Sequence, residues 1–119
     1  MEGYCVVTLA DATVWKKGDR RFGAIHRGKL YLFTGNEEQK KFLADPDRYS
    51  PALSGFDPVQ FTEAGKLIDG KRAHGLVFNN QMYLFTDEAS LSKFQSDPRR
   101  YSDTVQQAMR ASGNGTQLR

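Results

Sequence analysis

The candidate side chains of the soft or borderline types that bind transition metals are Cys5, His26, His74, Met82 and Met109, and a site is considered at the first three. Thiolate and imidazole groups are common protein ligands of zinc, copper and iron. One cysteine alone forms neither a cage of several thiolates nor an internal disulfide, so a site of this kind needs the two histidines as well. The sequence therefore gives these three residues as candidate ligands of a transition metal ion.

Each of the three residues also has a purely structural explanation. Cys5 lies in the apolar run Tyr4–Leu9, where a small buried thiol packs as a hydrophobe. His26 and His74 lie in segments with strand character, where a histidine packs its ring and hydrogen-bonds its nitrogens. On this explanation the protein has no cofactor.

Catalysis by side chains alone is not predicted. A cysteine nucleophile needs a base within hydrogen-bonding distance, and the apolar run around Cys5 offers none. Acidic residues such as Asp45, Asp57 and Asp97 each stand next to a proline, where an aspartate fits a turn. The chain has no glycine-rich phosphate-binding motif. We therefore expect a protein that is not an enzyme.

Composition excludes further classes of function. The 119 residues include 17 basic and 14 acidic side chains, which give a net charge of +3. Basic pairs such as Lys71-Arg72 and Arg99-Arg100 have an acidic residue close by, at Asp69 and Asp97. This mixing of charges argues against nucleic acid as a partner. No apolar run approaches the roughly 20 residues that a membrane-spanning helix needs.

The strongest internal signal is a repeat. Residues 3–50 align without a gap with residues 55–102, at a constant offset of 52, and 17 of these 48 positions are identical. Both copies contain Tyr-Leu-Phe-Thr, then Lys-Phe, then Asp-Pro-x-Arg-Tyr-Ser. Such self-similarity is typical of a supersecondary unit used twice. A unit of about 50 residues buries little surface by itself, so we expect the two copies to share a core.

Each repeat unit reads as a hairpin followed by a short helix. Residues 22–27 and 30–34 predict two strands around a tight turn, and residues 74–78 and 81–86 predict the same in the second copy. Arg27-Gly28 and Asn79-Asn80 suit the positive backbone angles of such turns.

Helix boundaries follow from caps and prolines. Thr34 with Glu37 has the form of a capping box, which predicts a helix over residues 37–44. Pro46 and Pro98 then end the helix of each copy. Asp103 predicts the start of a C-terminal helix that runs to Met109 or Ala111.

Together these features predict an α+β fold of two fused, pseudo-symmetric units. Residues 1–53 form the first unit, residues 54–112 form the second unit with the C-terminal helix, and residues 113–119 form a flexible tail. The predicted core draws on the large apolar residues of both hairpins and helices. They are Phe22, Ile25, Leu30, Leu32, Phe33, Phe42, Tyr49, Val77, Phe78, Leu84, Phe85, Phe94 and Tyr101.

The second copy resembles the YHS domain family. The motifs that carry the resemblance are Ser-Gly-Phe-Asp-Pro-Val-Gln-Phe, Gly-Lys-Leu-Ile-Asp-Gly-Lys, Asn-Gln-Met-Tyr-Leu-Phe-Thr and Phe-Gln-Ser-Asp-Pro-Arg-Arg-Tyr, at residues 54–61, 65–71, 80–86 and 94–101. The first copy matches over residues 28–49. The family occurs in metal-handling proteins, oxygenase components and envelope proteins, so the resemblance implies a fold more than a function.

The resemblance also implies where metal-binding cysteines would stand. None of those positions holds a cysteine in this chain: the residues are Thr8, Thr34 and Glu38 in the first copy and Gln60, Thr86 and Ser90 in the second. Hydroxyl and amide groups do not replace thiolates for a soft or borderline metal. The metal site of the family is therefore absent from both copies.

We accordingly expect a non-catalytic binding or interaction module, whose partner is a protein or a small ligand and which is a monomer or a homodimer. The alternative is a metal-handling module for copper, zinc or iron, with a site of its own at Cys5, His26 and His74. Because many similar proteins are exported, the bacterial cell envelope or periplasm is favoured over the cytoplasm.

Overall fold

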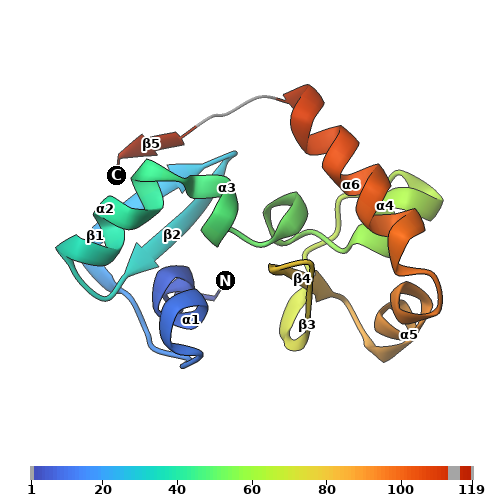
Figure 1. Ribbon diagram of the computed structural model, residues 1–119, viewed down its shortest axis with the longest axis horizontal. Coiled ribbons are helices and arrows are strands. Elements are labelled where there is room, and N and C mark those ends of the chain that lie inside the picture. The colour runs from blue at the N-terminus through green and yellow to red at the C-terminus, as the bar shows by residue number, and fades with distance from the viewer. Residues whose placement is uncertain (1, 113–115, 119) are drawn as a thin grey trace. The chain divides into compact units, whose positions relative to one another are not determined.

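The computed structural model describes residues 2–112 and 116–118 and has an α+β fold, as predicted. The chain forms two compact units and passes from unit 1 to unit 2 between Ser50 and Pro51. The repeat predicted this division a few residues later, after residue 53. Each unit contains one antiparallel hairpin together with several helices (Figure 1).

Apart from the short η1 of unit 2 and the C-terminal strand of unit 1, the two units run through the same order of elements. Unit 1 consists of α1 (Val6–Ala12), β1 (Asp19–His26), β2 (Lys29–Phe33), α2 (Asn36–Ala44) and α3 (Pro46–Tyr49). Unit 2 consists of the 3-10 helix η1 (Ala52–Gly55), α4 (Pro58–Ala64), β3 (Lys71–Phe78), β4 (Gln81–Phe85), α5 (Glu88–Ser96) and α6 (Pro98–Ser112). The main difference in length is in the last helix, because α6 continues well beyond the point at which α3 ends.

The hairpins of the two units have the same register. Gly23 pairs with Leu32 and Gly75 with Leu84, and in each hairpin an irregularity precedes this pair. Positive φ angles at both turn positions, 51° at Arg27 and 51° at Asn79 followed by Gly28 and Asn80, match the predicted tight turns.

Close backbone contact requires a glycine on the approach to each hairpin. A Cβ atom at Gly18 would lie 2.4 Å from the backbone of Leu32, and a Cβ atom at Gly70 would lie 2.4 Å from the backbone of Leu84. No side chain fits at that distance, so the chain passes directly over the second strand at these two glycines.

A short third strand extends the sheet of unit 1. Strand β5 (Thr116–Leu118) pairs antiparallel with Ala24–His26 of β1, which gives the strand order β2-β1-β5, whereas the sheet of unit 2 has the order β3-β4. Residues 113–119 were predicted to be a flexible tail. Within that segment, residues 113–115 and 119 lie outside the described part of the chain, and the residues between them form β5.

Two helix starts differ from the prediction. The capping box at Thr34 was wrong, because α2 begins after Gly35 and no side chain caps it. The hydroxyl of Thr34 is instead hydrogen-bonded with that of Thr8, 3.1 Å away. The C-terminal helix begins at Pro98 and not at Asp103, because proline suits the first turn of a helix as well as it ends the preceding one.

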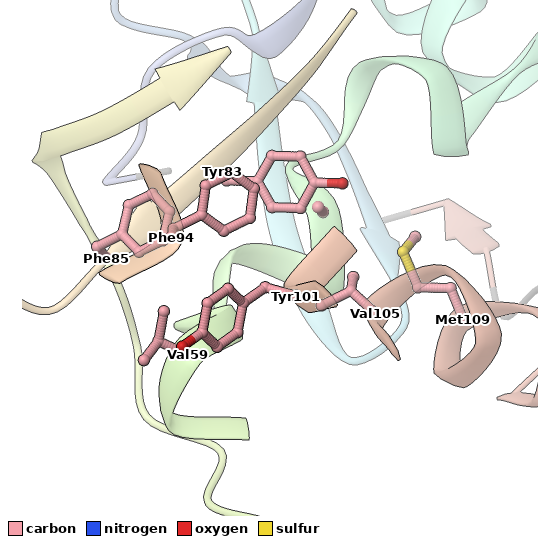
Figure 2. Packing of buried hydrophobic residues seen from close by; sticks show 8 residues of the cluster. Val59, Tyr83, Phe85, Phe94, Tyr101, Val105 and Met109 are labelled. Atoms are coloured by element: carbon pink, nitrogen blue, oxygen red, sulfur yellow. The ribbon is translucent and has the colours of Figure 1, made fainter. Parts of the chain in front are cut away.

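The buried apolar residues fall into two clusters, one in each unit, rather than into a single shared core. Unit 1 buries Cys5, Val6, Val7, Ala24, Tyr31, Phe33 and Phe42. Unit 2 buries Ala52, Val59, Tyr83, Phe85, Phe94, Tyr101, Val105 and Met109. Figure 2 shows the second cluster, in which side chains from α4, β4, α5 and α6 converge.

The prediction that Leu30 and Val77 belong to the core was wrong. Leu30 is 46% exposed and Val77 is 63% exposed. Alternate residues of a strand face opposite sides, and Tyr31 takes the buried side in β2 while Phe78 faces inward in β3. In the part of the chain that the structure describes, no helix is long and apolar enough to cross a membrane.

Candidate functional site

Cys5 is the N-cap of α1. Its sulfur accepts a hydrogen bond from the backbone N–H of Thr8 at 3.4 Å, and the hydroxyl of Thr34 lies 4.0 Å away. The side chain is fully buried in the cluster of unit 1. These contacts assign the thiol to capping and packing, in line with the structural explanation of Cys5.

The same position in unit 2 holds Asp57, which caps α4. Its carboxylate is fully buried and accepts hydrogen bonds from the backbone N–H groups of Val59, Gln60 and Thr86, and from the hydroxyl of Thr86, at 2.8 to 3.2 Å. A buried carboxylate is tolerated when its oxygens are paired in this way. Cys5 and Asp57 are therefore one structural position with two different side chains.

His26 is the second candidate ligand, and it lies at the end of β1 with its side chain fully buried. Its Nε2 atom is 2.8 Å from Oδ1 of Asp47 in α3. The guanidinium group of Arg27 donates to both oxygens of the same carboxylate, at 3.3 and 3.2 Å. Asp47 is thus the common acceptor of two neighbouring strand residues.

The electrostatics of Asp47 follow from these bonds. Burial raises its pKa, but hydrogen bonds from Arg27 and His26 outweigh burial and hold the pKa below the ordinary value. A carboxylate that stays ionised accepts hydrogen bonds only, so Nε2 of His26 carries the proton in this pair.

Tyr31 completes this group. The ring packs at 5.1 Å from that of Phe42, which also contacts the ring of His26. Burial and the charge of Asp47 raise the pKa of Tyr31, while Arg27 lowers it, so the phenol lies within the field of both groups. We call Tyr31, His26, Arg27 and Asp47 the Tyr31 cluster.

The hydroxyl of Tyr31 is buried, and among the described residues it has no hydrogen-bond partner. Its equivalent in unit 2, the hydroxyl of Tyr83, has one. The Nε2 atom of Gln106 in α6 donates to that hydroxyl at 3.3 Å and to Oε1 of Gln81 at 2.9 Å. Because α3 ends at Tyr49, the described part of unit 1 has no helix segment that corresponds to this part of α6.

The second copy of the repeat does not keep the charged residues of this cluster. Three of its four residues differ from their counterparts at the offset of 52: His26 from Phe78, Arg27 from Asn79, and Asp47 from Arg99. His26 is recognisable as a candidate by its residue type, whereas Asp47 is not, because 21 positions separate the two along the chain.

The three candidate metal ligands are distributed over both units. Cys5 and His26 belong to unit 1, whereas His74 is a half-buried residue of β3 in unit 2. Within residues 2–112 and 116–118, no group of three or more His, Cys, Asp or Glu side chains lies close enough together to hold a metal ion.

Comparison with known proteins assigns no family to the chain, because no protein-family model, no curated protein and no solved structure matches it.

Proposed function

We propose that the protein is a non-catalytic binding module and that its ligand is bound at the Tyr31 cluster. One observation carries the proposal. Tyr31 is only 2% exposed, and its buried hydroxyl has no hydrogen-bond partner among the described residues. An unsatisfied buried hydroxyl costs roughly 1 to 3 kcal/mol. A ligand that forms a hydrogen bond with the Tyr31 hydroxyl removes this cost. Binding of such a ligand would explain why the free protein has a buried hydroxyl without a partner.

The chemistry of the ligand follows from unit 2. There a carboxamide, that of Gln106, occupies the place beside the equivalent tyrosine. In unit 2 the NH2 group of this carboxamide donates to the phenol oxygen and to a second oxygen, so a carboxamide at the Tyr31 cluster donates its N–H groups to the phenol oxygen of Tyr31 and to the carboxylate of Asp47. The side chain of Asp47 is 46% exposed, so it remains accessible to such a donor. The ligand is therefore a small molecule or a partner side chain with a carboxamide group.

Binding without catalysis agrees with the other contacts of the site. The imidazole of His26 is fully buried and is held by Asp47, which fixes its orientation rather than presenting it to a substrate. The thiol of Cys5 caps α1. We also propose, on the resemblance given above, that both units are YHS-like; Thr8 and Thr34, which stand where that family has cysteines, lie within 3.1 Å of one another.

The first test compares Tyr31→Phe with the matched variant Tyr83→Phe. Loss of the Tyr83 hydroxyl removes one of the two hydrogen bonds that Gln106 donates, so the free energy of unfolding falls by about 1 kcal/mol. Loss of the Tyr31 hydroxyl removes an unsatisfied group, so stability is unchanged or rises. Urea denaturation measures both. An equal loss of stability in the two variants would show that Tyr31 has a partner already and would contradict the proposal.

The second test uses acetamide as a carboxamide probe in an NMR titration. We expect amide resonances around His26, Tyr31 and Asp47 to shift in the wild-type protein and to remain in place in Tyr31→Phe. Acetate, which Asp47 repels, serves as the control probe. If the wild-type protein and Tyr31→Phe respond alike to acetamide, the Tyr31 cluster does not bind a carboxamide.

Elemental analysis of the same samples separates this proposal from the metal-handling alternative. Stoichiometric zinc, copper or iron that disappears in both His26→Gln and His74→Gln would favour that alternative instead.

A further inference from the structure

The two hairpins differ in what covers their outer edge. In unit 1, β5 pairs antiparallel with residues 24–26 of β1. At the offset of 52, the same edge of unit 2 is formed by Leu76, Val77 and Phe78 of β3. Among the described residues, no strand pairs with that edge, because the sheet of unit 2 contains β3 and β4 only.

The register of the hairpin shows which backbone groups face the open edge. Phe78 and Gln81 flank the two-residue turn and form the last pair of the ladder, so their N–H and C=O groups point toward each other. These directions alternate along a strand, so the N–H and C=O groups of Val77 point away from β4. Ile25 is the equivalent of Val77, and it pairs with Gln117 of β5.

The open edge also lacks the usual protection against pairing. Edge strands are normally defended by charged residues, prolines or bulges. In β3 the charged residues Lys71 and Arg72 and the irregularity before Gly75 all lie in the first half of the strand. The second half presents Val77, whose side chain is 63% exposed.

We propose that this edge pairs with the same edge of a second copy of the chain, so that two β3 strands run antiparallel about a twofold axis at Val77. An edge that pairs with itself closes the assembly at a dimer and leaves no further edge of this kind open. The contact has the extent of the β1–β5 contact, three residue pairs: Val77 with Val77 of the second copy, and Leu76 with Phe78 in both directions.

Charge and side chains both fit this register. Because the axis lies at Val77 and each β3 strand ends at Phe78, Lys71 and Arg72 of one strand lie beyond the turn of the other, so no basic residue faces another. The exposed valines meet at the centre, next to Met82, which pairs with Val77 inside each hairpin. Apolar cross-strand pairs of this kind stabilise a sheet.

Val77→Pro tests the backbone contact. Proline removes the N–H group that faces the second copy, and it is tolerated in an edge strand when that N–H points outward. We expect the wild-type protein to form dimers between micromolar and millimolar concentration in sedimentation velocity, and we expect the dissociation constant to rise by about tenfold or more in the variant. The circular dichroism spectrum should be unchanged. A monomer at all concentrations, or a dimer that the variant leaves intact, would overturn the proposal.

A crosslinking experiment tests the register. Two residues of a hydrogen-bonded antiparallel pair have Cα atoms about 5.5 Å apart, within the range that a disulfide spans. Val77→Cys should therefore form a covalent dimer on mild oxidation. Ala73→Cys, an exposed position on the same strand and four residues from the axis, should not. Equal crosslinking of both variants would contradict pairing at Val77, and Cys5 stays out of the reaction because it is buried.

Discussion

Cys5 and Asp57 show one backbone position used with two chemistries. Both residues cap a seven-residue helix, and both accept N–H groups from its first turn. A carboxylate offers about four acceptor sites, so Asp57 also binds the N–H and the hydroxyl of Thr86, whereas a thiol accepts only weakly. The helix start of unit 2 is therefore held by more hydrogen bonds than that of unit 1.

Asp57→Ala is expected to lower the free energy of unfolding by about 3 kcal/mol, because it removes a helix cap and leaves buried donors without an acceptor. Urea denaturation measures the change. Asp103→Ala, at an exposed position on α6, is the control and should change stability by less than about 0.5 kcal/mol. Similar stability of both variants would show that the network around Asp57 contributes little.

Asp47 makes the stability of unit 1 depend on pH. Its pKa is held below the ordinary value in the folded protein, so its hydrogen bonds stabilise the fold at neutral pH. This contribution is lost as the pH falls below about 4, through the folded pKa. Asp47→Asn should therefore lower the urea midpoint at neutral pH and cost progressively less toward pH 2.

Two other carboxylates have a lowered pKa and also titrate at acidic pH. Their effect on stability cancels when Asp47→Asn is compared with the wild type. Hydrogen bonds from Arg21 lower the pKa of Asp19 to about 2, and hydrogen bonds from Tyr101 and Lys93 lower the pKa of Glu63. Both are present in the wild type and in the variant. A cost of Asp47→Asn that is the same at every pH would contradict the assignment.

The candidate site could be predicted from the sequence only in part. His26 is a candidate because of its residue type, but residue type does not show which groups surround it. The carboxylate that holds the imidazole comes from a different element, and the free hydroxyl of Tyr31 is visible only by comparison with Tyr83 and Gln106. Nothing in the sequence near Tyr31 indicates that its hydroxyl is buried.

Among the elements, α2 and α5 occupy equivalent places in the repeat and differ at their N-cap residues. Asp87 caps α5 through the N–H of Ser90, whereas Gly35 at the same position of α2 makes no side-chain cap. Both positions have extended backbone angles, so a side chain with a hydroxyl fits at Gly35 without strain. An added Cβ meets only the flexible end of Glu38, at 3.0 Å.

Gly35→Ser is therefore expected to raise the free energy of unfolding by about 0.5 to 1 kcal/mol, through a new cap and a less flexible unfolded chain. Asp87→Gly is the reverse change in the other unit and should lower stability by a few tenths of a kcal/mol or more. Thermal denaturation of both variants measures the effect. A loss of stability in Gly35→Ser would mean that the serine cannot adopt the rotamer seen for the aspartate.

Turns and prolines made most elements predictable, and the failures have physical causes. The hairpins follow from Arg27-Gly28 and Asn79-Asn80, whose backbone angles few other residue pairs adopt easily. Leu30 was misplaced because an unbroken apolar run does not show which face of a strand is buried. The start of α6 was misplaced because proline both ends one helix and begins the next.

For the whole molecule, the two clusters have matching centres. Phe42 contacts the rings of His26, Tyr31 and Phe33, and Phe94 contacts four aromatic rings of unit 2. Neither cluster contains a residue of the other unit. The α+β class and the repeated order of elements were predictable from the repeat. The number of cores was not, because the sequence shows which residues are apolar but not which of them pack together.

Phe42→Ala and Phe94→Ala should each cost about 3 to 5 kcal/mol, since each leaves a cavity at the centre of its cluster. Hydrogen exchange by mass spectrometry should locate the loss of protection within residues 2–50 for the first variant and within residues 51–112 for the second. Loss of protection along the whole chain in either variant would show that the two units unfold together.

Gly18 and Gly70 limit how far the two halves of this chain can diverge. Most positions differ between the two copies of the repeat, and Cys5 and Asp57 are one example. At these two glycines, any side chain would displace the second strand of the hairpin, β2 or β4. Each glycine stands 14 residues before the leucine whose backbone it contacts, Leu32 or Leu84. That interval is fixed by backbone contact rather than by function. It therefore provides a signature for finding distant relatives whose binding residues have all been replaced.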